Sequence, residues 1–327
     1  MGVSDRMRAK LGAFVVDSVF RGLSSVGRFH PMARPSRHNV HLERNVRYRE
    51  TGLDEHMLDI YRPHAPGPYP VVLYVHGGGF RILSKDSHWM MGLAFARRGY
   101  LTFNISYRLA PRHPFPAAVE DACAAYAWVA KHAASYGGDP SRLVLAGESA
   151  GANLVTALAV AATYQRDEPW SRAVWESQMV PSAVVPACGI LQVSDTARFG
   201  RRKRLSSLLL DRLTEVEEAY LKPSKASETE RELASPLLVL EKGARPARAL
   251  PSFFAPVGTA DPILDDTRRL KAALDRLGAN CQVKYYPNEL HAFHAVVFRK
   301  AARRCWMDIY RFLDGVVPAS GFATVPV

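Results

Sequence analysis

Cysteine is scarce in this 327-residue sequence, which holds four cysteines and no C-x-x-C pair. Cys123, Cys188, Cys281 and Cys305 lie far apart, so their spacing suggests neither a zinc site nor a disulfide framework. The basic N-terminus is followed by an apolar stretch that contains Asp17 and has no clear cleavage site, which argues against a secretory signal. We therefore expect a reducing, cytoplasmic compartment.

Long apolar runs and low-complexity segments are also lacking. Of two uncharged stretches, 149–165 begins polar and rich in small residues, and 177–194 is broken by Pro181 and Pro186, so neither predicts a membrane span. No repeat of 20 to 50 residues is visible, and 22 Gly and 22 Pro are too few for a collagen-like or disordered chain. With 48% hydrophobic and 23% charged residues, the composition is that of a globular protein.

Acidic residues are outnumbered, because 43 Lys and Arg less 31 Asp and Glu leave a net charge of +12. Residues 1–50 hold 10 basic and 4 acidic side chains, and residues 196–214 hold six basic ones against Asp211. No recognition motif or aromatic-interleaved basic tract accompanies this charge, so we expect no nucleic-acid partner. Two interpretations stay open: weak contact of the basic N-terminal segment with an anionic membrane surface, or a solvated outer face.

From residue 69 onward, short apolar runs alternate with helical patterns. This alternation predicts an α/β fold with a mostly parallel sheet covered by helices. A turn containing Gly52 joins two further strands into an antiparallel start. The eight expected strands are 46–48, 57–61, 71–75, 101–105, 143–145, 183–185, 252–257 and 282–286, and the expected helices are 89–98, 117–135, 150–164, 265–277 and 295–313.

Two regions do not fit the alternation. Residues 1–45 contain an amphipathic helical pattern, and residues 195–233 are polar helical sequence between two strands. Both are candidates for an added layer outside the sheet and its helices.

The strongest chemical motif is Gly147-Glu148-Ser149-Ala150-Gly151, which follows the apolar run 143–145 and precedes a helix. A G-x-S-x-G sequence between strand and helix places the serine on a sharp turn, where its hydroxyl projects from the sheet edge. The amide of Ala150 then lies at a helix N-terminus, where an unsatisfied N–H can face an oxyanion.

A second motif, His76-Gly77-Gly78-Gly79, ends another apolar strand. Consecutive glycines expose backbone N–H groups that can bind an anion. Alone, the stretch could also be a phosphate loop or a flexible linker, but no Lys-Ser/Thr pair follows, which disfavours a Walker-type nucleotide site.

A nucleophilic serine needs a base and a group that orients the base. Asp261 and His291 each lie just past an apolar strand, and the order Ser149, Asp261, His291 is that of α/β-hydrolases. Asp265 and Asp266 are better explained as residues at a helix start. His294 is the alternative base if the last strand ends later.

These motifs together resemble the hormone-sensitive-lipase-like esterases, the bacterial family IV of the α/β-hydrolases. The matching stretches are 76–80, 107–111, 115–121, 138–140, 147–154, 261–262 and 291–293. The resemblance implies a nucleophile at Ser149, a general base at His291 and its orienting acid at Asp261. It also implies an oxyanion hole from the amides of Gly78, Gly79 and Ala150, with His76 and Gly77 shaping the loop.

The resemblance implies hydrolysis of short- to medium-chain acyl esters without a metal or organic cofactor. It divides the chain into a cap segment at 1–45, a catalytic core at 46–194, a cap insertion at 195–233 and the rest of the core at 234–327. Alternatives are an amidase or arylformamidase, and a non-catalytic receptor, which the presence of His291 disfavours. A homodimer is left open. Ser106, Arg112-His113, Glu148 and Ala152 depart from the family pattern around the site.

Overall fold

The computed structural model describes residue 22, residues 30–202 and residues 205–318. Most of the expected N-terminal cap segment, and the amphipathic helix predicted there, lie outside these described residues. No helix in the described part of the chain is long and apolar enough to cross a membrane.

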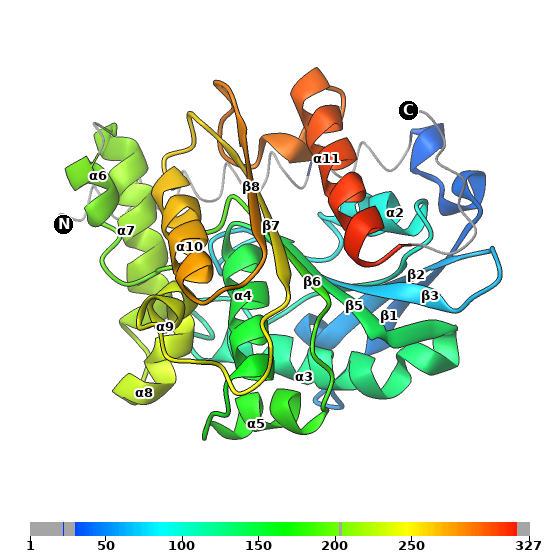
Figure 1. The fold of residues 1–327 in the computed structure, drawn as a ribbon, viewed down its shortest axis with the longest axis horizontal. Helices are drawn as coiled ribbons and strands as arrows, with labels where there is room; N and C mark the ends of the chain where they lie inside the picture. Colours follow the sequence, from blue (N-terminus) through cyan, green and yellow to red (C-terminus); the bar gives the residue numbers. More distant parts are fainter. Residues whose placement is uncertain (1–21, 23–29, 203–204, 319–327) are drawn as a thin grey trace.

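An eight-stranded sheet runs through the middle of the molecule in the order β1-β2-β4-β3-β5-β6-β7-β8 (Figure 1). β2 is antiparallel to β1 and to β4, and the remaining neighbours are parallel. This confirms the mostly parallel sheet with an antiparallel start. The strands are β1 (Val40–Arg47), β2 (Met57–Pro63), β3 (Tyr69–Val75), β4 (Leu101–Ile105), β5 (Gly138–Glu148), β6 (Ala183–Ala187), β7 (Ser252–Gly258) and β8 (Cys281–Tyr286).

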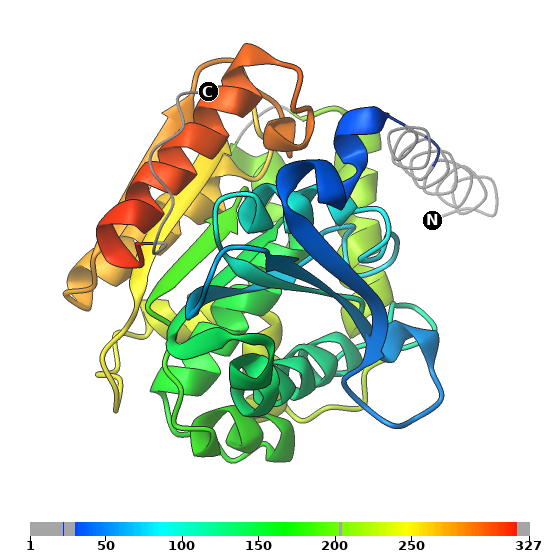
Figure 2. The same cartoon turned by 90° about the vertical axis from the view of Figure 1, so that its right-hand side faces the viewer.

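Helices cover both faces of the sheet. Along β3, Val72 and Tyr74 pack with α2 (Trp89–Ala96) and α11 (Lys300–Val316), whereas Val71, Leu73 and Val75 pack on the other side. That second side holds α3 (Ala117–His132), α4 (Ala150–Thr163) and α10 (Leu264–Arg276), with α5 (Pro169–Glu176) and α9 (Pro236–Glu241) against α4. Figure 2 shows α11, in red, on the opposite side of the molecule from β1, in dark blue.

The helix that follows Ser149 is buried along its whole length. Every residue of α4 is buried, which fits its run of alanine, valine and leucine with few polar side chains. Because α4 is enclosed by the sheet and by neighbouring helices, its N-terminus is held in a fixed place at the end of β5.

The segment 195–233 forms α6 (Arg198–Arg202), α7 (Ser207–Leu221) and α8 (Glu228–Arg231), as its helical pattern predicts. Ser206 caps α7 by accepting a hydrogen bond from the Leu209 amide, and Ser227 caps α8. The buried ring of Tyr220, near the end of α7, stacks on Phe80 at 4.0 Å between centroids. Helix α7 therefore packs against the loop that follows β3.

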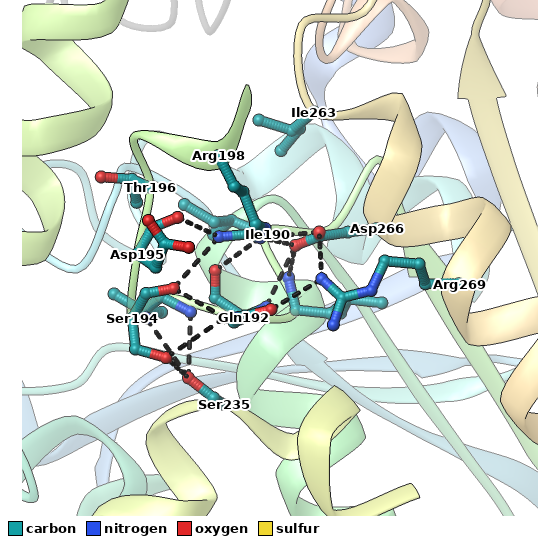
Figure 3. A network of polar contacts seen from close by, with 12 residues as sticks. Ile190, Gln192, Ser194, Asp195, Thr196, Arg198, Ser235, Ile263, Asp266 and Arg269 are labelled. Carbon is teal, nitrogen blue, oxygen red and sulfur yellow. Dashed lines mark hydrogen bonds and ion pairs between the residues drawn. The ribbon is translucent and has the colours of Figure 1, made fainter. Parts of the chain in front are cut away.

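A buried ion pair ties this insertion to the sheet domain (Figure 3). Arg198 of α6 contacts Oδ1 of Asp266 in α10 at 2.6 Å, and Asp266 also accepts the amides of Leu191 and Gln192. Asp266 lies in the first turn of α10, as expected, but its fully buried carboxylate also joins three separate segments.

Some element boundaries differ from the prediction. β1 begins at Val40 rather than at residue 46, inside the segment assigned to the cap. Most of its side chains are exposed or half-buried, because β1 is an edge strand, so its sequence lacks the apolar signal of a core strand. β5 begins at Gly138 rather than at 143, and the last helix begins at Lys300 rather than near 295.

Candidate active site

Ser149 occupies the sharp turn between β5 and α4, with φ of +54° and ψ of −114°. The two flanking glycines lie too close to β3 for side chains. A Cβ on Gly147 would come within 2.7 Å of the Val75 carbonyl oxygen, and one on Gly151 within 2.0 Å of the same atom. Glycine at both positions thus allows the strained turn that exposes the serine hydroxyl.

The three residues expected to form a triad meet at the carboxyl edge of the sheet. Nε2 of His291 lies 3.0 Å from Oγ of Ser149, and Nδ1 lies 2.9 Å from Oδ2 of Asp261. Asp261 is buried, and its other oxygen accepts the amide of Ile263 at 2.9 Å. The turns after β5, β7 and β8 supply the three residues, as their positions after apolar runs predicted.

The environment of His291 favours its protonated form. Burial lowers the pKa of His291, but the charge and hydrogen bond of Asp261 raise it, and the pKa lies above its usual value. An imidazole beside a carboxylate accepts a proton readily and stays oriented when charged. The geometry therefore suits transfer of a proton from Ser149.

The glycine loop after β3 lies against this turn. A Cβ on Gly77 would come within 2.9 Å of Glu148 and 3.3 Å of the Ser149 Cβ. Gly78 and Gly79 have φ of +107° and +59°, and a Cβ on Gly78 would come within 2.2 Å of the Ile82 carbonyl oxygen. The loop therefore approaches the serine with backbone alone, and Ala150 presents the first amide of α4 beside it.

His76 anchors the start of this loop. Its ring stacks on Tyr107 at 4.2 Å, and the Tyr107 hydroxyl donates to the His76 carbonyl oxygen at 2.9 Å. The loop thus leans on the Tyr107-Arg-Leu-Ala-Pro stretch, one of the segments that carried the family resemblance.

Two further side chains, those of His88 and Tyr74, and the backbone amide of Gly77 surround Glu148. Its buried carboxyl contacts the Gly77 amide at 2.5 Å, His88 Nε2 at 2.8 Å and the hydroxyl of Tyr74. Burial raises the pKa of Glu148 to about 8 and lowers the pKa of His88 to about 4. His88 precedes α2 with no local pattern to mark it, so this contact could not be predicted from the sequence.

The alternative base and one cysteine lie close by. His294 is buried, its carbonyl oxygen accepts the indole N–H of Trp306, and burial lowers its pKa to about 4, so His291 is the histidine that faces Ser149. The sulfur of Cys188 lies within 4.8 Å of the ring nitrogen of His291 and a carboxylate oxygen of Asp261. Burial raises the pKa of this thiol.

Helix α7 approaches the glycine loop from the outside. A Cβ on Gly79 would come within 2.8 Å of Val216 Cγ2. Beside this contact, Arg81 pairs with Glu215 at 2.6 Å, and both side chains are largely buried. The insertion therefore touches the loop directly.

Comparison with known proteins agrees with this arrangement. A family model described as alpha/beta hydrolase fold matches residues 72–295, which contain the serine, aspartate and histidine of the site. The chain belongs to this alpha/beta hydrolase family. The hydrolase is 30% identical over 77% of its length to the carboxylesterase NlhH of Mycobacterium tuberculosis, covering 74% of that protein.

Other relatives of this hydrolase are esterases as well. It is 30% identical over 72% of its length to an acetyl esterase of Salmonella schwarzengrund, covering 68% of that protein. The crystal structure of esterase LipW from Mycobacterium marinum superposes with a TM-score of 0.74 at 25% identity, covering 93% of this chain and 90% of LipW. The expected resemblance to hormone-sensitive-lipase-like esterases is thereby confirmed.

Proposed function

We propose that the protein hydrolyses carboxylic esters through an acyl-enzyme on Ser149. The observation that carries the proposal is the continuous link from Ser149 Oγ to His291 at 3.0 Å and from His291 to Asp261 at 2.9 Å. The names of the relatives, carboxylesterase and acetyl esterase, support the same reaction class.

In the first half of the reaction, Ser149 Oγ attacks the ester carbonyl while its proton moves to Nε2 of His291. The carbonyl oxygen becomes an oxyanion, which the amides of Gly78, Gly79 and Ala150 bind. Each such donor contributes about 3 kcal/mol to the transition state. The bond to the alcohol oxygen then breaks, and the alcohol leaves with the proton from Nε2.

In the second half, water attacks the acyl carbon and gives a proton to Nε2. The tetrahedral intermediate uses the same three amides, the bond to Ser149 Oγ breaks, and the proton returns to that oxygen as the acid leaves. Asp261 holds Nδ1 throughout, so that His291 keeps the tautomer that both halves require.

The proposed substrates are esters of short- to medium-chain acids. The contact of α7 with the glycine loop supports an acyl-binding site of limited size. We propose that residues 195–233 and the N-terminal segment form a cap. The core beneath this cap consists of residues 46–194 and 234–327. A panel of p-nitrophenyl esters tests this, with highest kcat/KM expected from acetate to hexanoate. Highest activity on emulsified long-chain triglyceride would contradict it.

The same residues would also attack an amide, which is the alternative activity. Comparing turnover of an ester and an amide of one acyl group separates an esterase from an amidase or arylformamidase. A receptor would bind ligand without turnover. Three predictions concern partners: the basic N-terminal segment contacts anionic membranes weakly, the protein has no nucleic-acid partner, and it forms a homodimer.

The decisive test replaces the nucleophile. Ser149→Ala should lower kcat for p-nitrophenyl acetate on the order of 10⁴-fold or more, with the fold retained. An organophosphate should label wild-type Ser149 once per chain and leave the variant unlabelled. Full activity of Ser149→Ala would refute the mechanism.

A further inference from the structure

Glu148 makes three polar contacts next to the triad. Its carboxyl is 3% exposed and lies at the end of β5, directly before Ser149. Oε1 contacts both the Gly77 amide at 2.5 Å and His88 Nε2 at 2.8 Å, while the Tyr74 hydroxyl is hydrogen-bonded to Oε2. The carboxyl thus joins the turn of the nucleophile to the loop expected to bind the oxyanion.

The hydrogen atoms around His88 can be assigned from its neighbours. The Ser87 hydroxyl donates to the Ser84 carbonyl oxygen at 2.7 Å. Nδ1 of His88 lies 2.9 Å from the Ser87 hydroxyl oxygen and 3.3 Å from the Ser84 carbonyl oxygen. Since a carbonyl oxygen only accepts and the hydroxyl hydrogen is already used, Nδ1 must carry the hydrogen. In a neutral ring Nε2 is then an acceptor, so the hydrogen on the 2.8 Å link belongs to Glu148.

This assignment satisfies every polar atom of the carboxyl at once. Oε1 donates its hydrogen to His88 and accepts the Gly77 amide, and Oε2 accepts from Tyr74. The separate effects of burial agree, because the pKa of Glu148 is raised to about 8 and that of His88 lowered to about 4, which leaves both groups uncharged at pH 7.

We propose that Glu148 and His88 form a positioning pair that shares one hydrogen, an inference that rests on the proposed function. The pair lets the Glu148 carboxyl fix the Gly77 amide, and with it the oxyanion loop, without placing a negative charge beside the developing oxyanion. A carboxylate in that place would oppose the charge that the loop binds. His88 is therefore a positioning residue that acts on the reaction through Glu148.

The charged and titratable groups that face Glu148 come from several elements. Tyr74 lies on β3, His88 precedes α2, His291 follows β8, and Cys188 follows β6. Burial raises the pKa of Cys188 well above its usual value, so that thiol does not titrate near pH 8. Loss of the Glu148 proton near pH 8 should therefore appear as a fall in kcat on the alkaline side.

Glu148→Asp tests the positioning role, because the shorter acid cannot reach Gly77 and His88 together. We expect kcat for p-nitrophenyl acetate, per active site titrated with organophosphate, to fall about 10- to 100-fold while KM stays within about threefold. The inhibition constant of a trifluoromethyl ketone, which forms the oxyanion adduct, should rise in proportion. If Glu148 had a merely structural role, the fall in kcat and the rise in the inhibition constant would not be proportional.

Glu148→Gln tests the shared hydrogen. A glutamine can accept from Gly77 or donate to His88 but cannot do both from one atom, so kcat at pH 7 should fall about tenfold. It has no proton to lose, so the decline of kcat above about pH 8 in the wild type should be absent in the variant between pH 7.5 and 9.5.

The matched control is Glu168→Gln, a buried glutamate paired with Arg166 at 2.6 Å at the start of α5. It should keep the wild-type kcat and pH profile. The inference is overturned if folded Glu148→Asp keeps wild-type kcat and inhibitor affinity, or if Glu148→Gln keeps the alkaline decline. A wild type without ester hydrolysis would overturn the proposed function as well, which distinguishes the two failures.

Discussion

Val216 of α7 lies against Gly79 of the glycine loop, so closely that a Cβ on Gly79 would come within 2.8 Å of Val216 Cγ2. The insertion 195–233 thus touches the loop that faces Ser149, although the two segments are far apart in the sequence. Because the loop has φ of +59° at Gly79, its conformation depends both on glycine and on the space that Val216 leaves.

Gly79→Ala should therefore lower kcat for p-nitrophenyl acetate about 10- to 100-fold. The alanine meets left-handed backbone strain of about 1–2 kcal/mol in addition to the contact with Val216. Steady-state kinetics of the variant and of Gly79→Ala/Val216→Ala check this, since removal of the Val216 methyl groups should recover part of the loss.

Gly243→Ala is the matched control for backbone strain. Gly243 has φ of +71°, and no atom lies within 4 Å of the place a Cβ would take. We expect a modest loss of stability with unchanged kcat. Equal kinetic losses in Gly79→Ala and Gly243→Ala would show that the contact with α7 has no influence on the site.

The acid limb of the pH profile should reflect the link between His291 and Asp261. His291 acts as a base only when neutral, and its pKa is raised above its usual value because the charge and hydrogen bond of Asp261 outweigh burial. The rate constant kcat/KM should therefore decline at acid pH with a midpoint above that of an unperturbed histidine. Asp261→Asn removes the raising charge. It should move the midpoint to lower pH and reduce kcat on the order of 10⁴-fold.

Rate measurements from pH 5 to 9 on both proteins provide the check. The sign follows from the charge: a positive imidazolium is stabilised by the carboxylate, and without it the neutral base persists to lower pH. A midpoint that stays in place or rises in Asp261→Asn would mean that another group titrates in this range.

The sequence predicted the residues of the site better than their surroundings. Ser149, Asp261 and His291 each follow an apolar strand, and the ends of neighbouring parallel strands meet at one edge of the sheet, so local patterns sufficed to bring them together. The glycine loop was predictable for the same reason, since it follows β3 beside β5.

Other features depend on contacts that leave no local pattern. His88 reaches Glu148 from a loop before α2, and Val216 reaches Gly79 from an insertion, so neither position is marked by its neighbours in sequence. β1 was placed too late because an edge strand with mostly exposed side chains lacks apolar alternation. Such errors concern surroundings and boundaries rather than the motif residues.

The packing of α7 on the loop should contribute to stability through Tyr220. Its buried ring stacks on Phe80 at 4.0 Å and meets Phe115 edge-on at 5.6 Å. Tyr220→Leu should lower the free energy of unfolding by about 1–3 kcal/mol, whereas Tyr220→Phe keeps both ring contacts and should cost under about 1 kcal/mol. Urea unfolding followed by tryptophan fluorescence measures both, and equal losses would contradict the importance of stacking.

Substitution within the ion pair between Arg198 and Asp266 should lower the free energy of unfolding strongly. Asp266 is fully buried and accepts the amides of Leu191 and Gln192 besides Arg198, so Asp266→Asn leaves a buried guanidinium without its counter-charge. Breaking such a pair from one side costs about 3–5 kcal/mol. Urea unfolding should show this loss.

Asp275→Asn, on the same helix, provides the comparison. Asp275 is half exposed and pairs with the exposed Lys271 at 2.5 Å, and such a surface pair contributes about 0–1 kcal/mol. A loss for Asp266→Asn no larger than that for Asp275→Asn would mean that the network in Figure 3 does not hold the insertion to α10. If the loss is large, kcat of the folded fraction tells whether this ion pair also affects the site, because Asp266 follows Asp261 by only five residues.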